Sequence, residues 1–309
     1  MSNGKVSYGK FWQRQVWQQF WQENGRAYLL LLPAVGLIGL LFGGGLVLAV
    51  LQSLGLIGLL SEGRLTLAAY RAALTNPEFL RSLGLSLYLA VVATGLSTGL
   101  SVALALLLRR AGQWASFAAQ ITLPIPYLVG VVGILLLLSP SGLLSRLLFA
   151  WGWIQSDQDF PLLVNDAANL GVLLLFLWKE IPFITLILLA VLRAMNPNYE
   201  AQARLLGANP WQCFWHVTLP LLRPGILSAS LLVFGFIFSA FEVPFLLGST
   251  RPRTLPVLVY RAFTDTDLSR RPEAIALGLI LSLLSFLLIG VYLWCTSGRK
   301  LRPPSASSE

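Results

Sequence analysis

The stretch GANPWQCFWHVTLPLLRPG, residues 207–225, lies between two long apolar runs and breaks their pattern. Its glycines, prolines and polar residues indicate a folded segment rather than part of a membrane-spanning helix. Just upstream, NPNYEAQARLL (196–206) predicts a short helix that begins after Pro197, because proline is favoured in the first turn of a helix. Gly207 then permits a tight turn, because glycine adopts backbone conformations that other residues avoid.

The second half of the stretch predicts another short helix over 210–219, with Pro210 in its first turn. Spacings of three and four residues place four apolar side chains near one face: Trp211, Phe214, Trp215 and Leu219. Because proline interrupts helices, we expect Pro220 and Pro224 to separate this short helix from the next apolar run. An arrangement of helix, glycine turn and helix suits docking on another protein.

The composition indicates that lipid is the solvent for much of the chain. Hydrophobic residues make up 56% and charged residues only 11%, with a mean hydropathy of +0.73, whereas soluble domains carry about 25% charged residues. The net charge of +9 does not indicate nucleic acid, because the basic residues cluster at the ends of apolar runs. Cys213 and Cys295 cannot form a disulfide framework, and His216 is the single histidine, which excludes a cluster of histidine metal ligands.

Six apolar runs are long enough to cross a bilayer, which takes about 20 residues. The predicted spans are 28–52, 83–108, 116–138, 169–192, 225–248 and 274–296. The chain is therefore predicted to be an all-α membrane protein, with a six-helix transmembrane domain over 28–296. We expect an N-terminal segment, 1–27, before this domain and a polar tail, 297–309, after it. The first run starts too late and is too long for a signal peptide.

The N-terminal segment contains an amphipathic pattern, FWQRQVWQQFWQENGR, over residues 11–26. Apolar residues at helical spacing share one face: Trp12, Val16, Trp17, Phe20 and Trp21. The pattern fits a helix lying on the cytoplasmic membrane surface, because tryptophan prefers the headgroup level. It fits equally an extension of the first span.

The distribution of Lys and Arg favours cytoplasmic termini. In that orientation the inner side carries 12 of these residues and the outer side nine, and positive residues concentrate on the cytoplasmic side. The pair Arg109-Arg110 and the basic residues of the C-terminal tail support this orientation locally. The segment 194–224 then lies in the cytoplasm.

The spacing around Gly207 resembles that of a cytoplasmic loop in the permease subunits of binding-protein-dependent ATP-binding-cassette (ABC) importers. The pattern of that loop is E-A-A, three residues, G, nine residues, I, one residue, L-P. In this sequence Gly207 matches the glycine, Val217 matches the isoleucine, and Leu219-Pro220 matches the L-P. The chain is thus similar to this family at its most specific motif.

Other positions complete the resemblance. Ala203 matches the second alanine of the motif and Arg204 the basic residue that often follows it. Ala201 stands at the glutamate position, and Glu200 lies one residue earlier. Similarity extends over most of the chain, including the segments 29–37, 65–83 and 234–248.

The resemblance implies a type I ABC importer permease fold in which residues 194–224 form a coupling loop, seated in a cleft of an ATPase subunit. The residues expected near this contact are Glu200, Ala203, Arg204, Gly207, Ala208, Trp211, Leu219 and Pro220. The alternative is a loop that only caps the fourth and fifth spans.

The resemblance also implies the partners of the chain. They are ABC ATPase subunits, a second permease, and a periplasmic or lipid-anchored solute-binding protein. The second permease is either a homologous chain, which would make a heterodimer, or a copy of this one. The location it implies is the bacterial inner membrane. The sequence lacks the G-x-x-x-x-G-K-[ST] phosphate loop, so we expect ATP to be bound by the partner and no cofactor to be bound here.

Charged residues within the spans point to the solute pathway, because charges in the bilayer are costly and often functional. Prolines lie near them and can interrupt the helices around a shared cavity. The residues predicted to line or gate the pathway are Tyr127, Glu180, Ser239, Phe241 and Glu242. The alternative for Glu242 and Glu180 is a structural ion pair with Lys179 or another subunit. For Glu242 the two roles are equally supported, and for Lys179 the structural role is favoured.

The sequence offers less about the solute. The segments FEVPFLLG (241–248) and RTLPVLVYRAFTDTD (253–267) resemble the polyamine, iron and thiamine type of permease more than the sugar type. Acidic residues in the pathway would attract a cation such as a polyamine. A sugar-type permease remains an alternative, as do an ion-coupled secondary transporter and a membrane-embedded enzyme.

Overall fold

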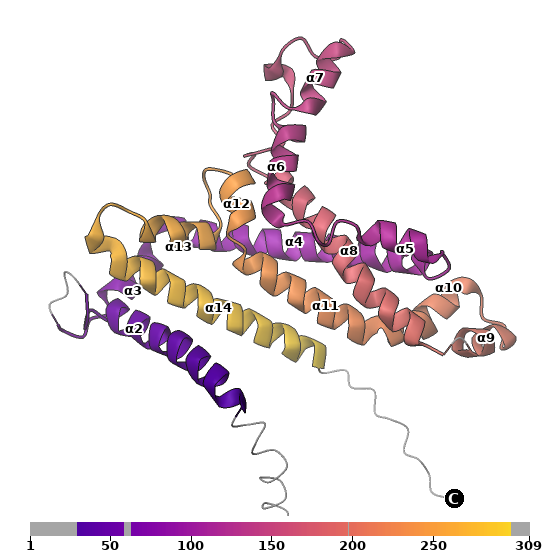
Figure 1. Ribbon diagram of the computed structural model, residues 1–309, viewed down its shortest axis with the longest axis horizontal. Coiled ribbons are helices and arrows are strands. Elements are labelled where there is room, and N and C mark those ends of the chain that lie inside the picture. Colours follow the sequence, from indigo (N-terminus) through magenta and orange to yellow (C-terminus); the bar gives the residue numbers. More distant parts are fainter. Residues whose placement is uncertain (1–29, 59–62, 197, 298–309) are drawn as a thin grey trace, which may run out of the picture. The chain divides into compact units, whose positions relative to one another are not determined.

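The computed structural model describes residues 30–58, 63–196 and 198–297 (Figure 1). In these ranges the regular elements are helices, and no strand occurs. The chain divides into two compact units, Met1–Ala69 and Tyr70–Glu309. The two units are described one at a time.

The described part of the first unit is dominated by one apolar helix, Leu30–Ser53. It contains a short π-helical stretch, η1 (Gly39–Gly43), followed by α2 (Gly44–Ser53). The predicted span over 28–52 matches this helix. The predicted amphipathic segment, 1–27, lies outside the described residues.

The second unit contains the other five spans. Its elements in chain order, the first of which begins in the first unit, are α3 (Ala68–Thr75), α4 (Pro77–Leu108), α5 (Gln113–Gln120), α6 (Tyr127–Leu138), α7 (Leu143–Ala150), η2 (Asp157–Asp159), α8 (Leu170–Ala194), α9 (Asn198–Leu205), α10 (Pro210–Cys213), η3 (Phe214–Thr218), α11 (Leu219–Ser239), α12 (Glu242–Leu247), α13 (Leu255–Phe263), η4 (Leu268–Arg270) and α14 (Arg271–Ser297). Together with the first unit, six described helices are long and apolar enough to cross a membrane, as predicted.

The second span begins earlier than predicted because the sequence supplies a cap. The Asn76 side chain accepts a hydrogen bond from the backbone N–H of Glu78, at 2.9 Å, and Pro77 occupies the first helical position. Both features are typical of helix starts. The helix α4 therefore starts at Pro77, six residues before the predicted boundary at 83, and ends at 108 as predicted.

The prediction of a continuous third span over 116–138 is wrong. The helix α5 ends at Gln120, and irregular backbone follows until α6 begins at Tyr127. Pro124 and Pro126 lie in this break, lack backbone N–H groups and disfavour a helical residue before them. The apolar segment long enough to span is instead Tyr127–Ala150, which comprises α6 and α7.

The prediction that two prolines separate the coupling loop from the fifth span is also wrong. One apolar helical segment runs from Pro210 to Ser239. The π-helical turn η3 lies directly before α11, where Pro220 is among the first two residues, and Pro224 lies inside that helix. The helical segment therefore continues through both prolines. The span then ends at Ser239 rather than at 248.

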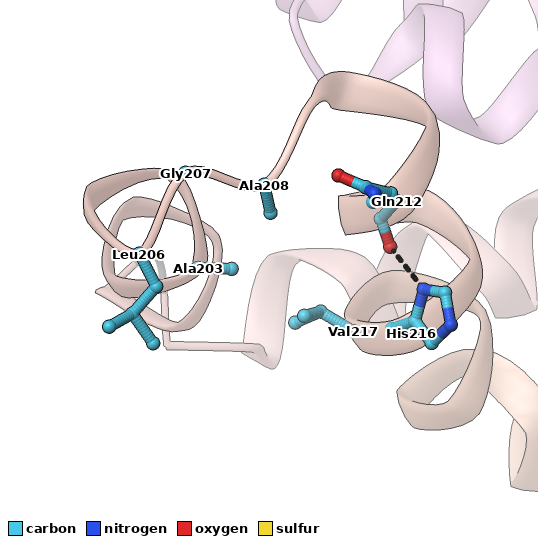
Figure 2. Close-up of a pocket in the computed structure, with 7 residues that line it drawn as sticks. All are labelled: Ala203, Leu206, Gly207, Ala208, Gln212, His216 and Val217. Carbon is cyan, nitrogen blue, oxygen red and sulfur yellow. Dashed lines mark hydrogen bonds between the residues drawn. The ribbon is translucent and has the colours of Figure 1, made fainter.

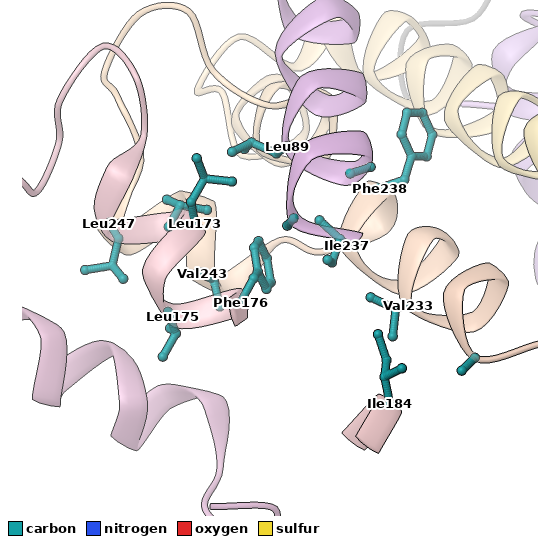
Figure 3. Packing of buried hydrophobic residues seen from close by; sticks show 14 of the residues in the cluster. Leu89, Leu173, Leu175, Phe176, Ile184, Val233, Ile237, Phe238, Val243 and Leu247 are labelled. Carbon is teal, nitrogen blue, oxygen red and sulfur yellow. The ribbon is translucent and has the colours of Figure 1, made fainter. Parts of the chain in front are cut away.

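The core of the second unit is formed where α8 packs against α4 and α11, with α12 beside α8 (Figure 3). Phe176 of α8 and Phe238 of α11 are fully buried there, together with Leu89 of α4. Small buried residues, Ala93 and Ala229, let these helices approach closely. Close packing of small residues is the main source of helix association in lipid, where apolar side chains gain little from leaving the solvent.

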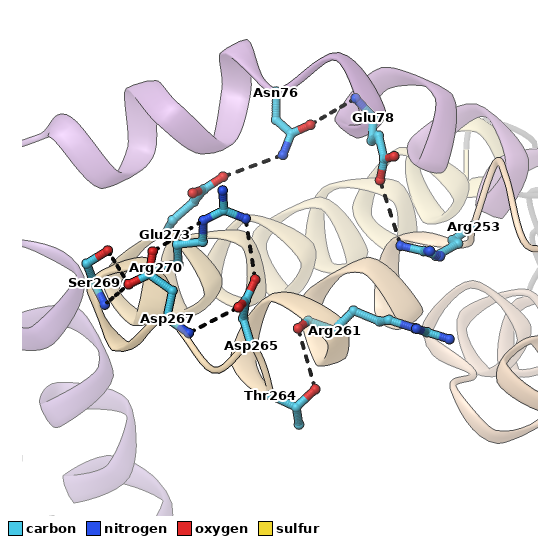
Figure 4. A network of polar contacts seen from close by, with 10 residues as sticks. All are labelled: Asn76, Glu78, Arg253, Arg261, Thr264, Asp265, Asp267, Ser269, Arg270 and Glu273. Atoms are coloured by element: carbon cyan, nitrogen blue, oxygen red, sulfur yellow. Dashed lines mark hydrogen bonds and ion pairs between the residues drawn. The ribbon is translucent and has the colours of Figure 1, made fainter.

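The N-terminal ends of α4 and α14 are joined by polar contacts (Figure 4). The Asn76 side chain donates to the Glu273 carboxylate at 3.5 Å, and Arg253 lies 4.0 Å from Glu78. A second group surrounds Arg270, which lies 3.3 Å from the Asp265 carboxylate. Because these pairs are partly exposed, each contributes little to the free energy of unfolding, and we assign them mainly to the orientation of the segments before and after α13.

Candidate functional site

The turn between α9 and α10 has the geometry expected from its glycine. Gly207 has φ of +88°, in the left-handed region that favours glycine. Its N–H donates to the Arg204 carbonyl at 2.9 Å, and the Ala208 N–H donates to the Ala203 carbonyl at 3.0 Å. These bonds satisfy carbonyl groups that the end of α9 would otherwise leave free, so the turn is a defined helix end.

The start of α10 is equally defined. The Asn209 side chain accepts from the Gln212 N–H at 2.8 Å, and the Gln212 side chain accepts from the Asn209 N–H at 2.9 Å. This reciprocal pair is a capping box, which satisfies two N–H groups at a helix start. Pro210 occupies the first helical position, as predicted. The chain direction is therefore fixed on both sides of Gly207.

A carboxylate joins this segment to the end of α4. Both oxygens of Glu200 accept hydrogen bonds from the Arg109 guanidinium, each at 2.6 Å, and Thr218 donates to Glu200 Oε1 at 2.7 Å. Bidentate arginine–carboxylate pairs are among the stronger polar contacts in proteins. The hydrogen bonds from Arg109 lower the pKa of Glu200 to about 2, and the hydrogen bond to Glu200 raises the pKa of Arg109.

An open hollow of about 360 Å³ lies between α9 and the helix that follows (Figure 2). Seven residues line it: Ala203, Leu206, Gly207, Ala208, Gln212, His216 and Val217. The His216 ring lies 3.0 Å from the Gln212 carbonyl oxygen, measured from Nδ1. Apart from these two polar side chains the lining is apolar, and the hollow could accept an apolar side chain of another protein.

Large apolar side chains are exposed around the hollow. Leu205 and Leu206 are 87% and 89% exposed, and Trp211 is 68% exposed. The Trp211 ring contacts those of Phe214 and Trp215, with centroids 6.1 and 5.6 Å away, so three of the four residues predicted to share a face do so. Exposed apolar groups gathered on a rigid segment are typical of a protein interface.

A second polar cluster lies within the spans. Lys179 of α8 is 5% exposed and donates to three backbone carbonyls of the break between α5 and α6, those of Thr122, Leu123 and Ile125, at 2.9, 3.1 and 2.7 Å. The Tyr127 hydroxyl, at the start of α6, donates to Glu180 Oε1 at 2.5 Å. Lys179 therefore satisfies carbonyls of a non-helical segment, which fits the structural role favoured for it.

The remaining predicted pathway residues lie at the end of α11 and the start of α12. Ser239 is exposed, and its hydroxyl donates to the Gly235 carbonyl of its own helix at 2.8 Å. Phe241 packs against two rings, with centroids 5.0 Å from Phe245 and 4.6 Å from Tyr260. Glu242 lies in the first turn of α12 and is exposed.

The predicted pathway residues thus form two groups: Ser239, Phe241 and Glu242 in one, and Tyr127 and Glu180 in the other. The helix α11 connects the groups, because it ends at Ser239 and its Phe236 ring lies 5.1 Å from the Tyr127 ring. The helix α12 also packs against α6 and α8.

The family is decided by a comparison with protein-family models. The model described as "Binding-protein-dependent transport system inner membrane component" matches residues 95–299 of this chain. That match covers about two thirds of the sequence and includes the whole coupling loop.

The chain belongs to this family. It is a multi-pass permease of the inner membrane, and the family consists of transport subunits rather than enzymes. The family therefore argues against the two other kinds of protein considered from the sequence, an ion-coupled secondary transporter and a membrane-embedded enzyme.

Curated relatives of the permease transport different solutes. The molybdenum transport system permease protein ModB of Mycobacterium tuberculosis is 32% identical over 226 residues, which cover 71% of the permease and 80% of ModB. The putrescine transport system permease protein PotI of Escherichia coli is 27% identical over 215 residues, which cover 69% of the permease and 70% of PotI. The family is therefore clear, while these relatives do not define one solute.

The fold of the permease is that of solved ABC importers. A crystal structure of a bacterial ABC transporter that imports alginate contains a chain of 18% identity and TM-score 0.76, with 93% of the permease and 99% of that chain covered. This agreement, with the six spans, confirms the prediction of an all-α type I ABC importer permease fold.

The predicted coupling residues of the permease fall into three environments. Ala203, Gly207 and Ala208 line the hollow, while Arg204 and Trp211 are exposed beside it. Leu219 and Pro220 lie in the first turn of α11, at the base of the fifth span. Glu200 differs from the rest, because its carboxylate is directed to Arg109 and Thr218. Their contact with an ATPase stays a prediction.

Sequence reasoning missed several residues of this site. Arg109 and Thr218 complete the Glu200 cluster, and Gln212 both caps α10 and lines the hollow with His216. The capping box was readable, because Asn209 precedes Gln212 by three residues. The Arg109 contact was not, since 91 residues separate it from Glu200.

Proposed function

We propose that the permease forms half of a solute pathway in an ABC importer and transmits movement from a partner ATPase through the coupling loop, residues 194–224. The observation that carries this proposal is the geometry of the loop. A glycine turn and a capping box fix two helices against each other, and Leu205, Leu206 and Trp211 are exposed at their junction. A segment of this rigidity transmits displacement, whereas a slack loop would dissipate it.

The partners in this proposal are ABC ATPase subunits that bind ATP, a second permease and a solute-binding protein. The solute-binding protein is supported by a solved structure of similar fold. That structure is a bacterial alginate ABC transporter in complex with a periplasmic protein that holds an alginate pentasaccharide. In this arrangement both termini and the coupling loop are cytoplasmic, and the permease requires no cofactor of its own.

Site-directed photo-crosslinking tests the ATPase contact. The photoreactive amino acid p-benzoylphenylalanine would replace Trp211, and a matched control would replace Trp153, which is 76% exposed and lies far along the chain in the segment after α7. We expect the ATPase subunit to copurify with both variants and to cross-link only from position 211. Absence of an ATPase from the purified complex, or cross-linking from 153 alone, would contradict the proposed function.

We further propose that the solute is a small organic cation such as a polyamine. Support comes from Glu242, an exposed acidic residue next in the chain to Phe241, which forms an aromatic cluster with Phe245 and Tyr260. A carboxylate attracts a cation, and aromatic faces bind ammonium groups. The relationship to PotI agrees with this choice, whereas ModB points to an oxyanion as the competing solute.

Uptake assays distinguish the two solutes. The assembled transporter, with its binding protein, would be supplied with labelled putrescine, spermidine, molybdate or sulfate in the presence of ATP. We expect uptake of a polyamine, reduced in Glu242→Gln and retained in a control, Glu273→Gln, whose carboxylate contacts Asn76 instead. Uptake of an oxyanion, or equal polyamine uptake by both variants, would overturn the cation proposal and leave the coupling proposal intact.

A further inference from the structure

We propose that Arg109 and Glu200 form a clamp that fixes the coupling loop to the end of α4, so that Glu200 is a positioning residue rather than a contact for the ATPase. The proposal rests on the proposed function of this loop. Glu200 does not occupy the glutamate position of the family motif. Ala201 stands at that position, and Glu200 lies one residue earlier.

The geometry shows that the carboxylate is already engaged. Both oxygens of Glu200 accept from the Arg109 guanidinium at 2.6 Å, and Oε1 also accepts from Thr218 at 2.7 Å. The side chains of the pair are only 23% and 18% exposed. A partner that bound this carboxylate directly would have to displace a bidentate charge-assisted pair, which is among the stronger hydrogen-bonded arrangements.

The helix α9 depends on this contact for its position. All eight residues of α9 are described, and none of them is buried. Burial of apolar side chains is what usually fixes a short helix, since an isolated helix of this length is marginal in water. Glu200 is the α9 side chain that bonds to other elements, through Arg109 after α4 and Thr218 at the base of α11.

The clamp also determines which helices would follow the loop. The Arg109 N–H donates to the Ala105 carbonyl at 2.9 Å, so Arg109 continues the backbone of α4. The helix α4 packs against α8 and α11, which form the core of the second unit. A displacement of α9 would therefore move the second span through the Arg109 contact. It would also move the fifth span, because α9 is joined to α11 by the intervening backbone.

A further consequence concerns the charge that the loop presents to its partner. By sequence, Glu200 is the single acidic residue in 194–224, and the clamp neutralises it. The exposed cations of this segment, Arg204 in α9 and Arg223 in α11, remain unneutralised by an acidic residue of the segment. Charge complementarity then assigns to the ATPase an apolar cleft with carboxylates at its rim.

Loop mobility and ATPase retention together test the clamp. A nitroxide would be attached at Gln202→Cys, an exposed position of α9 that does not line the hollow, in a background with Cys213→Ser and Cys295→Ser, in the complete transporter in nanodiscs. We expect Arg109→Gln and Glu200→Gln to increase nitroxide motion about tenfold in rate, because the loop loses its attachment. Both variants should retain the ATPase, since neither side chain faces it. The reversed pair, Arg109→Glu with Glu200→Arg, should restore slow motion.

The matched control is Arg110→Gln, which removes a neighbouring exposed cation and should leave the motion unchanged. Should the charge variants not fold, Thr218→Val removes one of the three hydrogen bonds and should raise the motion by a smaller factor. Unchanged motion in all variants, or loss of the ATPase from Glu200→Gln but not from Arg109→Gln, would overturn the clamp. Absence of the ATPase from the complex of the unmodified permease would instead overturn the proposed function. The nitroxide motion of the variants, compared with that of the parent, would still test the clamp.

Discussion

At the scale of single residues, Gly207 decides the shape of the coupling loop through its backbone. No atom lies within 4 Å of the position that a Cβ would take, so a side chain would meet no steric obstacle there. The φ of +88° is therefore the reason that this position favours glycine. A β-branched residue there would cost roughly 1–2 kcal/mol in backbone strain alone.

We therefore expect Gly207→Val to reduce ATP-dependent transport while the permease still inserts in the membrane. Gly207→Asn is the control, because asparagine tolerates the left-handed region. Transport rate and membrane abundance would be measured for both variants. Wild-type transport by the valine variant would show that the turn does not depend on glycine.

The pKa of Glu200 predicts how the clamp responds to pH. It is lowered to about 2 from 4.5, so the carboxylate stabilises the fold at pH values above 4.5, and this contribution is lost as the pH falls towards 2. The difference in thermal unfolding midpoint between the wild type and Glu200→Gln should thus stay constant from about pH 8 to about pH 5 and shrink in more acidic buffer. A difference that disappears between about pH 7 and 6 would contradict this assignment.

At the scale of elements, two of the predicted spans differ from the structure, because the prolines in and beside an apolar run do not alone decide where a helix is interrupted. The apolar run over 116–138 looks continuous, but Lys179 of α8 supplies the donors that make a break near Pro124 and Pro126 tolerable. Conversely, Pro220 suggests a break, but the helical segment continues through it into α11. In both cases the backbone hydrogen bonds, which periodicity does not report, decide where a helix ends.

The break before α6 should therefore depend on Lys179. In Lys179→Met the part-buried carbonyls of Thr122, Leu123 and Ile125 would lose this donor, which should reduce the free energy of unfolding by about 1–3 kcal/mol, the cost of an unsatisfied polar group. The adjacent variant Glu180→Gln is the control, because an amide oxygen can still accept from Tyr127. Denaturation in detergent measures both, and equal stability of the two variants would be incompatible with the capping role.

At the scale of the whole molecule, the number of spans was predictable because bilayer thickness sets the length of an apolar run. The specific spacing from Gly207 to Pro220 likewise indicates the family to which the chain belongs. The contacts between distant segments, such as Arg109 with Glu200, were not predictable, because no local pattern records which side chains meet across 91 residues.

The orientation of the whole chain can be tested with single cysteines at the two ends of the spans. In the background without Cys213 and Cys295, a membrane-impermeant maleimide would be added to intact spheroplasts and to inverted vesicles. With cytoplasmic termini, Leu206→Cys should react only in inverted vesicles, because it lies in the coupling loop and is exposed. Arg270→Cys, at the start of the sixth span, should react only in spheroplasts. The reverse pattern would place the coupling loop outside the cell, where no ATP-binding partner could reach it. It would therefore contradict the proposal that the loop transmits movement from an ATPase.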